Sequence, residues 1–191
     1  MKRILTILSL ALLTCACDPY KDNPVCNAIG EAAMKPYGEQ PYKVKFESLE
    51  KIDSTLMRTE LETRIRLFNV KIEKNRELYG KYTATNRPKN AQKKKDAIEK
   101  DLQILSRLSR LGDQIGDSLD SVAYYDYKFT AYAKVDGKTV EMVDCYATVT
   151  PNNEVITMSS DLKSLHKATG KVIPGYMEIM KNTSDEEVGE E

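Results

Sequence analysis

The chain has 191 residues, of which 29 are basic and 29 are acidic. This balance of charge argues against a nucleic-acid-binding protein, because such proteins carry a basic excess. The length predicts one domain of ordinary size with a normal hydrophobic core. After residue 16 the sequence has no apolar run long enough to span a bilayer.

Residues 1–16 are typical of a secretory signal. Lys2 and Arg3 precede the apolar run 4–13, which is too short to cross a bilayer as a helix. The stretch "LLTCAC" resembles the bacterial lipoprotein signal, in which a cysteine that follows small residues becomes the lipidated N-terminus. Cys17 fits this role better than Cys15, because Ala16 precedes it. An uncleaved, buried N-terminal helix is the alternative.

The resemblance implies a membrane anchor, since several acyl chains on Cys17 would hold the protein stably. The sequence after Cys17 is similar to the short acidic export tag of Bacteroidetes lipoproteins, with Asp18 and Asp22 as its acidic residues. We therefore expect an outer-membrane envelope lipoprotein that faces either the cell surface or the periplasm. Loss of Lys2 and Arg3 with the signal reduces the basic residues from 29 to 27, against 29 acidic ones.

Composition divides the rest of the chain into three parts. Residues 17–41 contain four prolines and are expected to form the lipidated N-terminus and a tether, with one short helical piece near 27–35. Residues 42–181 are expected to form a single α+β domain. Residues 182–191 are rich in like charges that repel one another, which predicts an acidic, disordered tail.

Two long helices are expected in the first half of the domain. Apolar residues at helical spacing from Leu61 to Tyr79 predict one helix over about 54–79, which Gly80 would end. A second apolar stripe, from Ile98 to Ile115, predicts a helix over about 89–115. A short polar turn joins the two segments, so we expect them to lie antiparallel as a coiled-coil hairpin.

Strands are expected on both sides of this hairpin. Residues 42–46 alternate between apolar and charged, and residues 123–135 show the clearest alternation in the chain. Asp136-Gly137 predicts a type I′ turn into a return strand over 139–150, where out-of-phase apolar residues suggest a bulge. A third strand over 154–158 completes a meander. The fold class is therefore α+β, a long-helix hairpin packed on a small antiparallel sheet, with the hairpin as the expected cover of its apolar face.

The remaining cysteines and several surface residues are the candidate sites. Cys26 and Cys145 could form a disulfide in an oxidising compartment, and buried free thiols are the alternative. Tyr124 and Tyr132 fall on the polar side of their strand, where aromatic rings can bind ligands. The basic run that includes Lys93, Lys94 and Lys95 could contact anionic lipids or acidic glycans, or could be a solvated helix start.

Catalytic motifs are weak. His166 has no acidic neighbour closer in sequence than Asp161, so we expect a surface or packing role rather than a catalytic triad or a metal site. Nothing predicts a cofactor or a metal. We therefore expect a non-enzymatic lipoprotein that binds an envelope protein or a glycan. The alternative is a carboxylate-dependent hydrolase that uses two of Asp126, Glu141 and Asp144.

Overall fold

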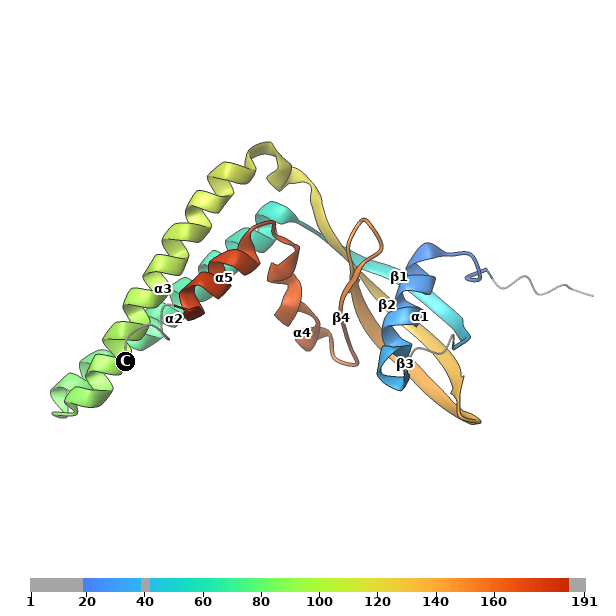
Figure 1. Ribbon diagram of the computed structural model, residues 1–191, viewed down its shortest axis with the longest axis horizontal. Helices are drawn as coiled ribbons and strands as arrows, with labels where there is room; N and C mark the ends of the chain where they lie inside the picture. Colours follow the sequence, from blue (N-terminus) through green and yellow to red (C-terminus); the bar gives the residue numbers. More distant parts are fainter. Residues whose placement is uncertain (1–18, 39–41, 186–191) are drawn as a thin grey trace, which may run out of the picture.

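The computed structural model describes residues 19–38 and 42–185, which form an α+β structure as predicted (Figure 1). Two long helices make a hairpin, and four strands make one antiparallel sheet. The elements in chain order are α1 (Pro24–Met34), η1 (Lys35–Tyr37), β1 (Val44–Leu56), α2 (Met57–Ala84), α3 (Pro88–Ile115), η2 (Gly116–Asp120), β2 (Val122–Val135), β3 (Lys138–Val149), β4 (Val155–Ser159), α4 (Leu162–Leu165), η3 (His166–Val172) and α5 (Tyr176–Asp185).

The sheet has the strand order β1-β2-β3-β4, so the N-terminal strand adds to the predicted meander. The turn between β2 and β3 has positive φ at both Asp136 (49°) and Gly137 (78°), as a type I′ turn requires. The predicted bulge is also present, because the register of β2 and β3 shifts between Phe129 and Ala131. β1 is much longer than residues 42–46, and α2 begins directly after it.

Helix α1 covers the apolar face of the sheet (Figure 1). Cys26 and Ile29 lie on one side of α1 and pack with Phe46, Phe129 and neighbouring strand residues. The Asn23 side chain caps the helix by accepting from the backbone N–H groups of the next turn. The expectation of a tether as far as residue 41 is therefore wrong for the described part of that segment: α1 belongs to the core.

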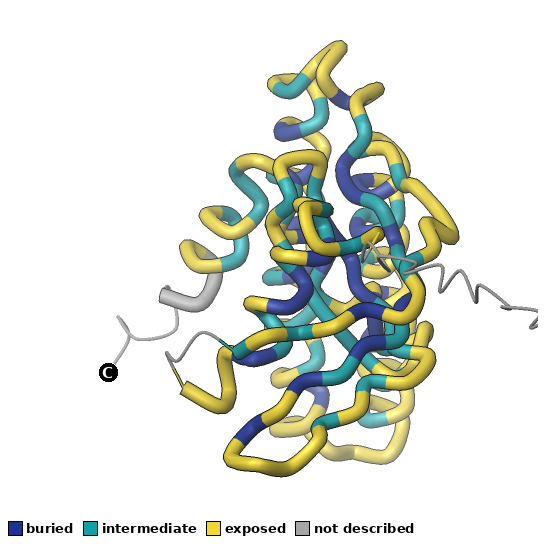
Figure 2. The backbone as a smooth tube through the Cα atoms, turned by 90° about the vertical axis from the view of Figure 1, so that its right-hand side faces the viewer, coloured by how far each residue is buried: buried dark blue, intermediate teal, exposed yellow. Residues whose placement is uncertain are grey.

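The helical hairpin has a core of its own. Leu61 on α2 packs with Ile104, Leu108 and Leu111 on α3, and α5 adds Tyr176 and Ile179 to this cluster. Because α1 occupies the sheet face, the hairpin meets the sheet only at the strand ends that lead into and out of it (Figure 1). Buried segments consequently occur in both the helical and the sheet parts (Figure 2).

The two helices of the hairpin are longer than predicted. Helix α2 continues through Gly80 to Ala84, and Pro88 occupies the first turn of α3. Polar contacts also join the helices: Lys71 Nζ lies 2.7 Å from Asp101 Oδ1, and Lys94 Nζ lies 3.0 Å from Asn75 Oδ1. These contacts fix which turns of the two helices face each other.

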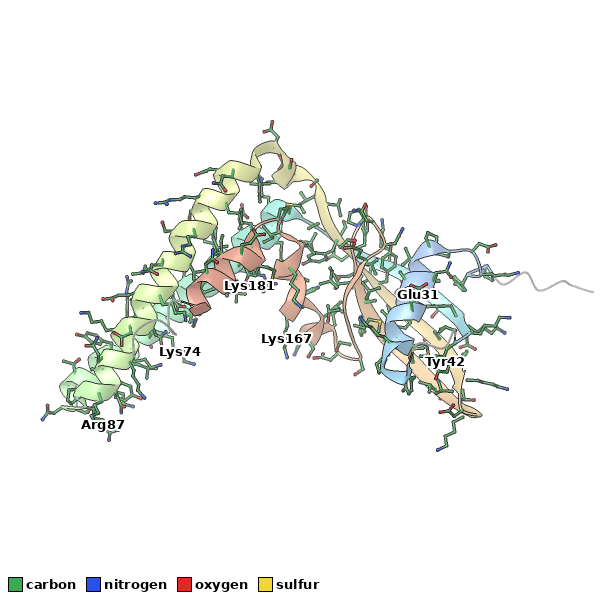
Figure 3. All side chains as sticks on the ribbon, in the orientation of Figure 1. Glu31, Tyr42, Lys74, Arg87, Lys167 and Lys181 are labelled. Atoms are coloured by element: carbon green, nitrogen blue, oxygen red, sulfur yellow. The ribbon has the colours of Figure 1, made fainter. Side chains whose placement is uncertain are left out.

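The molecule is elongated. Arg87 at the hairpin tip lies at the opposite end from Glu31 and Tyr42 in the sheet part (Figure 3). Helix α5 extends to Asp185, so the backbone at 182–185 is helical and the tail cannot begin at 182; residues 186–191 lie outside the described part. In the described ranges, no helix has both the length and the apolar character that crossing a bilayer requires.

Candidate functional site

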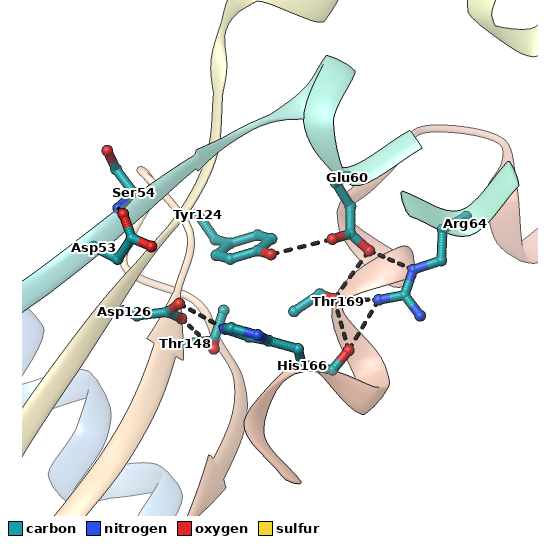
Figure 4. Close-up of polar contacts among 9 residues, drawn as sticks. All are labelled: Asp53, Ser54, Glu60, Arg64, Tyr124, Asp126, Thr148, His166 and Thr169. Atoms are coloured by element: carbon teal, nitrogen blue, oxygen red, sulfur yellow. Dashed lines mark hydrogen bonds and ion pairs between the residues drawn. The ribbon is translucent and has the colours of Figure 1, made fainter. Parts of the chain in front are cut away.

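A polar network lies where the hairpin meets the sheet (Figure 4). Its side chains come from the first turns of α2, from the start of β2, from the end of β3 and from η3. Five of its members are buried although they are charged or polar: Glu60, Arg64, Asp126, Thr148 and Thr169. Burial of such groups costs free energy unless each of them forms hydrogen bonds or an ion pair.

The buried carboxylate of Asp126 pairs with the partly exposed imidazole of His166. Asp126 is only 1% exposed, and its Oδ2 lies 2.7 Å from Nε2 of His166. The other carboxylate oxygen accepts a hydrogen bond of 2.7 Å from Thr148 on the neighbouring strand. The His166 side chain is 47% exposed, so one side of the ring faces solvent. Asp126 precedes His166 by 40 residues, so the search for acidic residues near His166 in sequence did not find this partner.

Glu60 and Arg64 form the second half of the network. Arg64 Nε donates to Glu60 Oε1 at 2.5 Å, one helical turn away. Arg64 also donates to the backbone oxygen of His166 and to Thr169 Oγ1. Tyr124 donates to the other oxygen of Glu60 at 3.1 Å. Burial, with the nearby Glu60 charge, raises the pKa of Tyr124 to about 12.

An imidazole held by a buried carboxylate is suited to proton transfer, provided that a reacting group can reach it. Within the described ranges, however, no serine, threonine or cysteine side chain bonds to the His166 ring. Neither of the two clefts reported below is lined by His166 or Asp126. The arrangement observed therefore links α2, β2, β3 and η3, and it does not present a bound nucleophile.

The structure does not bring the three candidate carboxylates together. Asp126 faces Thr148 and His166, whereas Asp144 pairs with Lys128 at 2.9 Å. Glu141 is exposed and lies opposite Tyr132 in the sheet register. Because each carboxylate has a different neighbour and none lines either cleft, their placement does not support a paired acid–base mechanism.

The aromatic and basic residues predicted to form a binding surface do not lie together in the structure. Tyr124 is buried, so its assignment to an exposed binding surface is wrong. Tyr132 lies on the same side of β2 as Tyr124 and is half-buried, and its role stays a prediction. Lys93 and Lys95 are exposed near the start of α3, whereas Lys94 is half-buried and donates to Asn75. Lys95 also lies 3.8 Å from Glu99 on the same helix.

The structure describes two cysteines, Cys26 and Cys145, and the predicted disulfide between them is not formed. Both belong to the apolar cluster between α1 and the sheet, and burial raises the pKa of the Cys145 thiol. Cys17 lies outside the described residues. Within the described ranges, no group of three His, Cys, Asp or Glu side chains could hold a metal ion.

Among the clefts that the described residues form, two are large enough to hold a ligand. One of about 720 Å³ lies between α3 and α5 and includes Arg107, Arg110 and Glu178. The other, of about 790 Å³, lies between α1 and the start of β1. The second cleft was not predicted, because its helical wall falls within the segment that the prolines suggested to be a tether.

Comparison of the chain with known proteins gives no match: no family model, no curated protein and no solved structure is significantly similar to it.

Proposed function

We propose that this chain is a lipid-anchored lipoprotein of the cell envelope with a non-catalytic binding or structural role. In this proposal Cys17 is the lipidated residue and the outer membrane is the anchoring membrane. The apolar run 4–13 followed by Ala16 and Cys17 supports the anchor. The folded part then stays in water while the acyl chains enter the bilayer.

The apolar run that leads to Ala16 and Cys17 carries the proposal, and the position of the N-terminal end relative to the hairpin tip determines the orientation that an anchor there would impose. Tyr20 packs against the sheet core, with its ring centroid 6.4 Å from that of Phe46. Tyr20 is three positions after Cys17, so the two Cα atoms lie about 11 Å apart at most. An anchor at Cys17 would therefore hold the sheet part close to the membrane. The tip at Arg87 lies at the far end of the molecule (Figure 3) and would project away from it.

The placement of polar residues favours binding over catalysis. The His166–Asp126 pair lies outside both clefts, and the carboxylates proposed for hydrolysis have unrelated neighbours. The cleft beside α1, in contrast, has the size of a ligand or peptide site. A partner-binding lipoprotein is therefore the function that this arrangement supports best.

The anchor is tested by labelling cells with an alkyne-bearing fatty acid and comparing wild type, Cys17→Ala and Cys15→Ala. Cys15→Ala is the matched control, because it removes the neighbouring thiol from the same signal. We expect label in wild type and Cys15→Ala, and none in Cys17→Ala. Equal labelling of Cys17→Ala and wild type would refute Cys17 as the lipidated residue.

A further inference from the structure

A groove follows the whole length of α1 on the side that faces β1. Its lining includes three pairs of adjacent residues, each pair one helical turn after the last: Cys26 and Asn27, Gly30 and Glu31, and Met34 at the end of α1 with Lys35 of η1. Residues 42–44 and Phe46 form the opposite wall. Gly30 allows the helix to approach the strand closely, since a Cβ at this position would lie 3.3 Å from Val44.

The strand beside this groove has an open edge. β1 is the outermost strand of the sheet and pairs only with β2 among the described strands. In an antiparallel strand, alternate residues point their backbone N–H and C=O groups away from the paired neighbour. No backbone hydrogen bond joins residues 44–56 to α1 or η1 within the described ranges. The outer edge of β1 is thus a template for another strand.

The groove combines an apolar floor with a basic rim. Cys26, Met34 and Phe46 are buried along the floor. Lys21, Lys35 and Lys43 are exposed at the rim, and Glu31 is the one carboxylate among the described lining residues. The rim is therefore complementary to an acidic ligand, and the floor is complementary to apolar side chains.

We propose that this groove binds an extended acidic peptide segment of a partner protein, which adds as a strand to the open edge of β1. Alternate side chains of a strand point to opposite faces, so apolar ones would contact the floor and acidic ones the lysines. The 11 residues of α1 span about 16 Å, which accommodates about five residues of extended peptide. This inference rests on the proposed binding role and does not depend on the lipid anchor.

The test uses the purified full chain carrying Cys17→Ala and a fluorescein-labelled octapeptide of alternating glutamate and valine. Fluorescence anisotropy is expected to show saturable binding. Two control peptides are expected to bind at least tenfold more weakly. One is a lysine–valine octapeptide, which reverses the charge. The other is a glutamate–valine octapeptide with N-methylated amides, which cannot donate the backbone hydrogen bonds of an added strand. No binding of the glutamate–valine peptide, or equal binding of all three, would overturn the proposal.

Variants of the chain then locate the binding site. The double substitution Lys35→Glu and Lys43→Glu is expected to reduce affinity at least tenfold. Lys138→Glu is the matched control, because Lys138 is also exposed on the sheet but lies on β3, away from the open edge of β1 and outside the groove lining, and it is expected to change affinity less than twofold. Equal effects of these changes would place the peptide elsewhere and overturn the proposal. The Cys17 labelling result is independent, so failure of either proposal can be recognised separately.

Discussion

Glu60 and Arg64 show how a buried ion pair can be fully satisfied. Glu60 is 2% exposed and accepts from Arg64, Tyr124 and Thr169. Arg64 reaches the backbone of η3 through His166. Because the charges are removed from water, each depends on the other and on these hydrogen bonds. The pair therefore joins the start of α2 to β2 and η3.

Glu60→Gln is expected to lower the free energy of unfolding by about 3–5 kcal/mol, since Arg64 then stays buried without its counter-charge. Glu73→Gln is the matched control on the same helix, where the ion pair with Arg76 is exposed, and its cost is expected to be below about 1 kcal/mol. Urea unfolding followed by circular dichroism measures both. Similar losses in the two variants would contradict this assignment.

The raised pKa of Tyr124 makes the stability of the fold depend on pH. Its pKa is about 12 in the folded state against an ordinary value of 10.0. Between these values the folded state keeps a proton that the unfolded state releases, so the free energy of unfolding falls as pH rises. The contribution is complete below pH 10.0 and is lost as pH approaches 12.

Replacement by phenylalanine tests this dependence. Tyr124→Phe is expected to reduce the loss of stability over this pH range by about 2–3 kcal/mol relative to wild type. Urea unfolding at closely spaced pH values measures the slope. Tyr132→Phe serves as the control, and it is expected to keep the wild-type slope. Identical slopes for wild type and Tyr124→Phe would show that Tyr124 does not carry the effect.

Local sequence patterns could not reveal these side-chain partners. The alternation of β2 correctly separates its two faces, but it does not tell which segment covers the polar one. Residues of η3 lie there, and they bury Tyr124 and Asp126. His166 follows Asp126 by 40 residues, so no spacing rule links them. The His166–Asp126 pair arises from tertiary structure alone.

Among the elements, α1 differs most from the sequence-based prediction. Its apolar residues Cys26 and Ile29 fill the sheet core, although prolines flank the helix on both sides. Proline is compatible with the first helical position, and Pro24 occupies it here. The same residues that suggested a tether are consequently compatible with a short, well-capped helix.

Ile29→Ala tests whether α1 belongs to the folded core. We expect it to lower the free energy of unfolding by about 2–5 kcal/mol, the usual cost of truncating a fully buried isoleucine. Ile52→Ala on β1 is the matched control. Because the Ile52 side chain is 38% exposed, this variant is expected to lose much less free energy of unfolding. Thermal or urea unfolding gives the comparison. If the two losses were equal, α1 would contribute little to the core.

The elements with strong periodicity could be predicted from the sequence, whereas their packing could not. The helical hairpin, the turn at Asp136-Gly137 and the bulge in β3 all follow from local patterns and are confirmed. The length of β1 was missed because most of residues 47–56 are exposed, so an apolar alternation is absent there. The predicted cover of the sheet is wrong, because the segment that forms α1 was assigned to a tether and the hairpin was then the available cover.

At the scale of the whole molecule, the elongated shape predicts an orientation on the membrane. In a Cys145→Ala background, Asn86→Cys places a thiol near the hairpin tip and Asp22→Cys places one beside α1. On membrane vesicles that display the anchored protein outward, the thiol at position 86 is expected to react several-fold faster with a 5-kDa polyethylene-glycol maleimide. The bilayer would hinder access to position 22.

The same two variants in detergent solution provide the control, and their rates are expected to become similar once the bilayer is removed. Native Cys26 is buried and present in both variants, so it contributes equally. Faster reaction at position 22 than at position 86 on vesicles would reverse the proposed orientation. It would leave the fold and the groove proposal unaffected.

The direct junction between β1 and α2 has a mechanical consequence. No loop separates Leu56 from Met57, and only Ser121 separates η2 from β2, so the hairpin is joined to the sheet by two short, stiff connections. Helix α2 has 28 residues and is about 42 Å long. A rotation of about 5° at the junction would therefore displace the hairpin tip by about 4 Å. A small rotation at the edge of the sheet would thus move the hairpin tip much farther than it moves the strands.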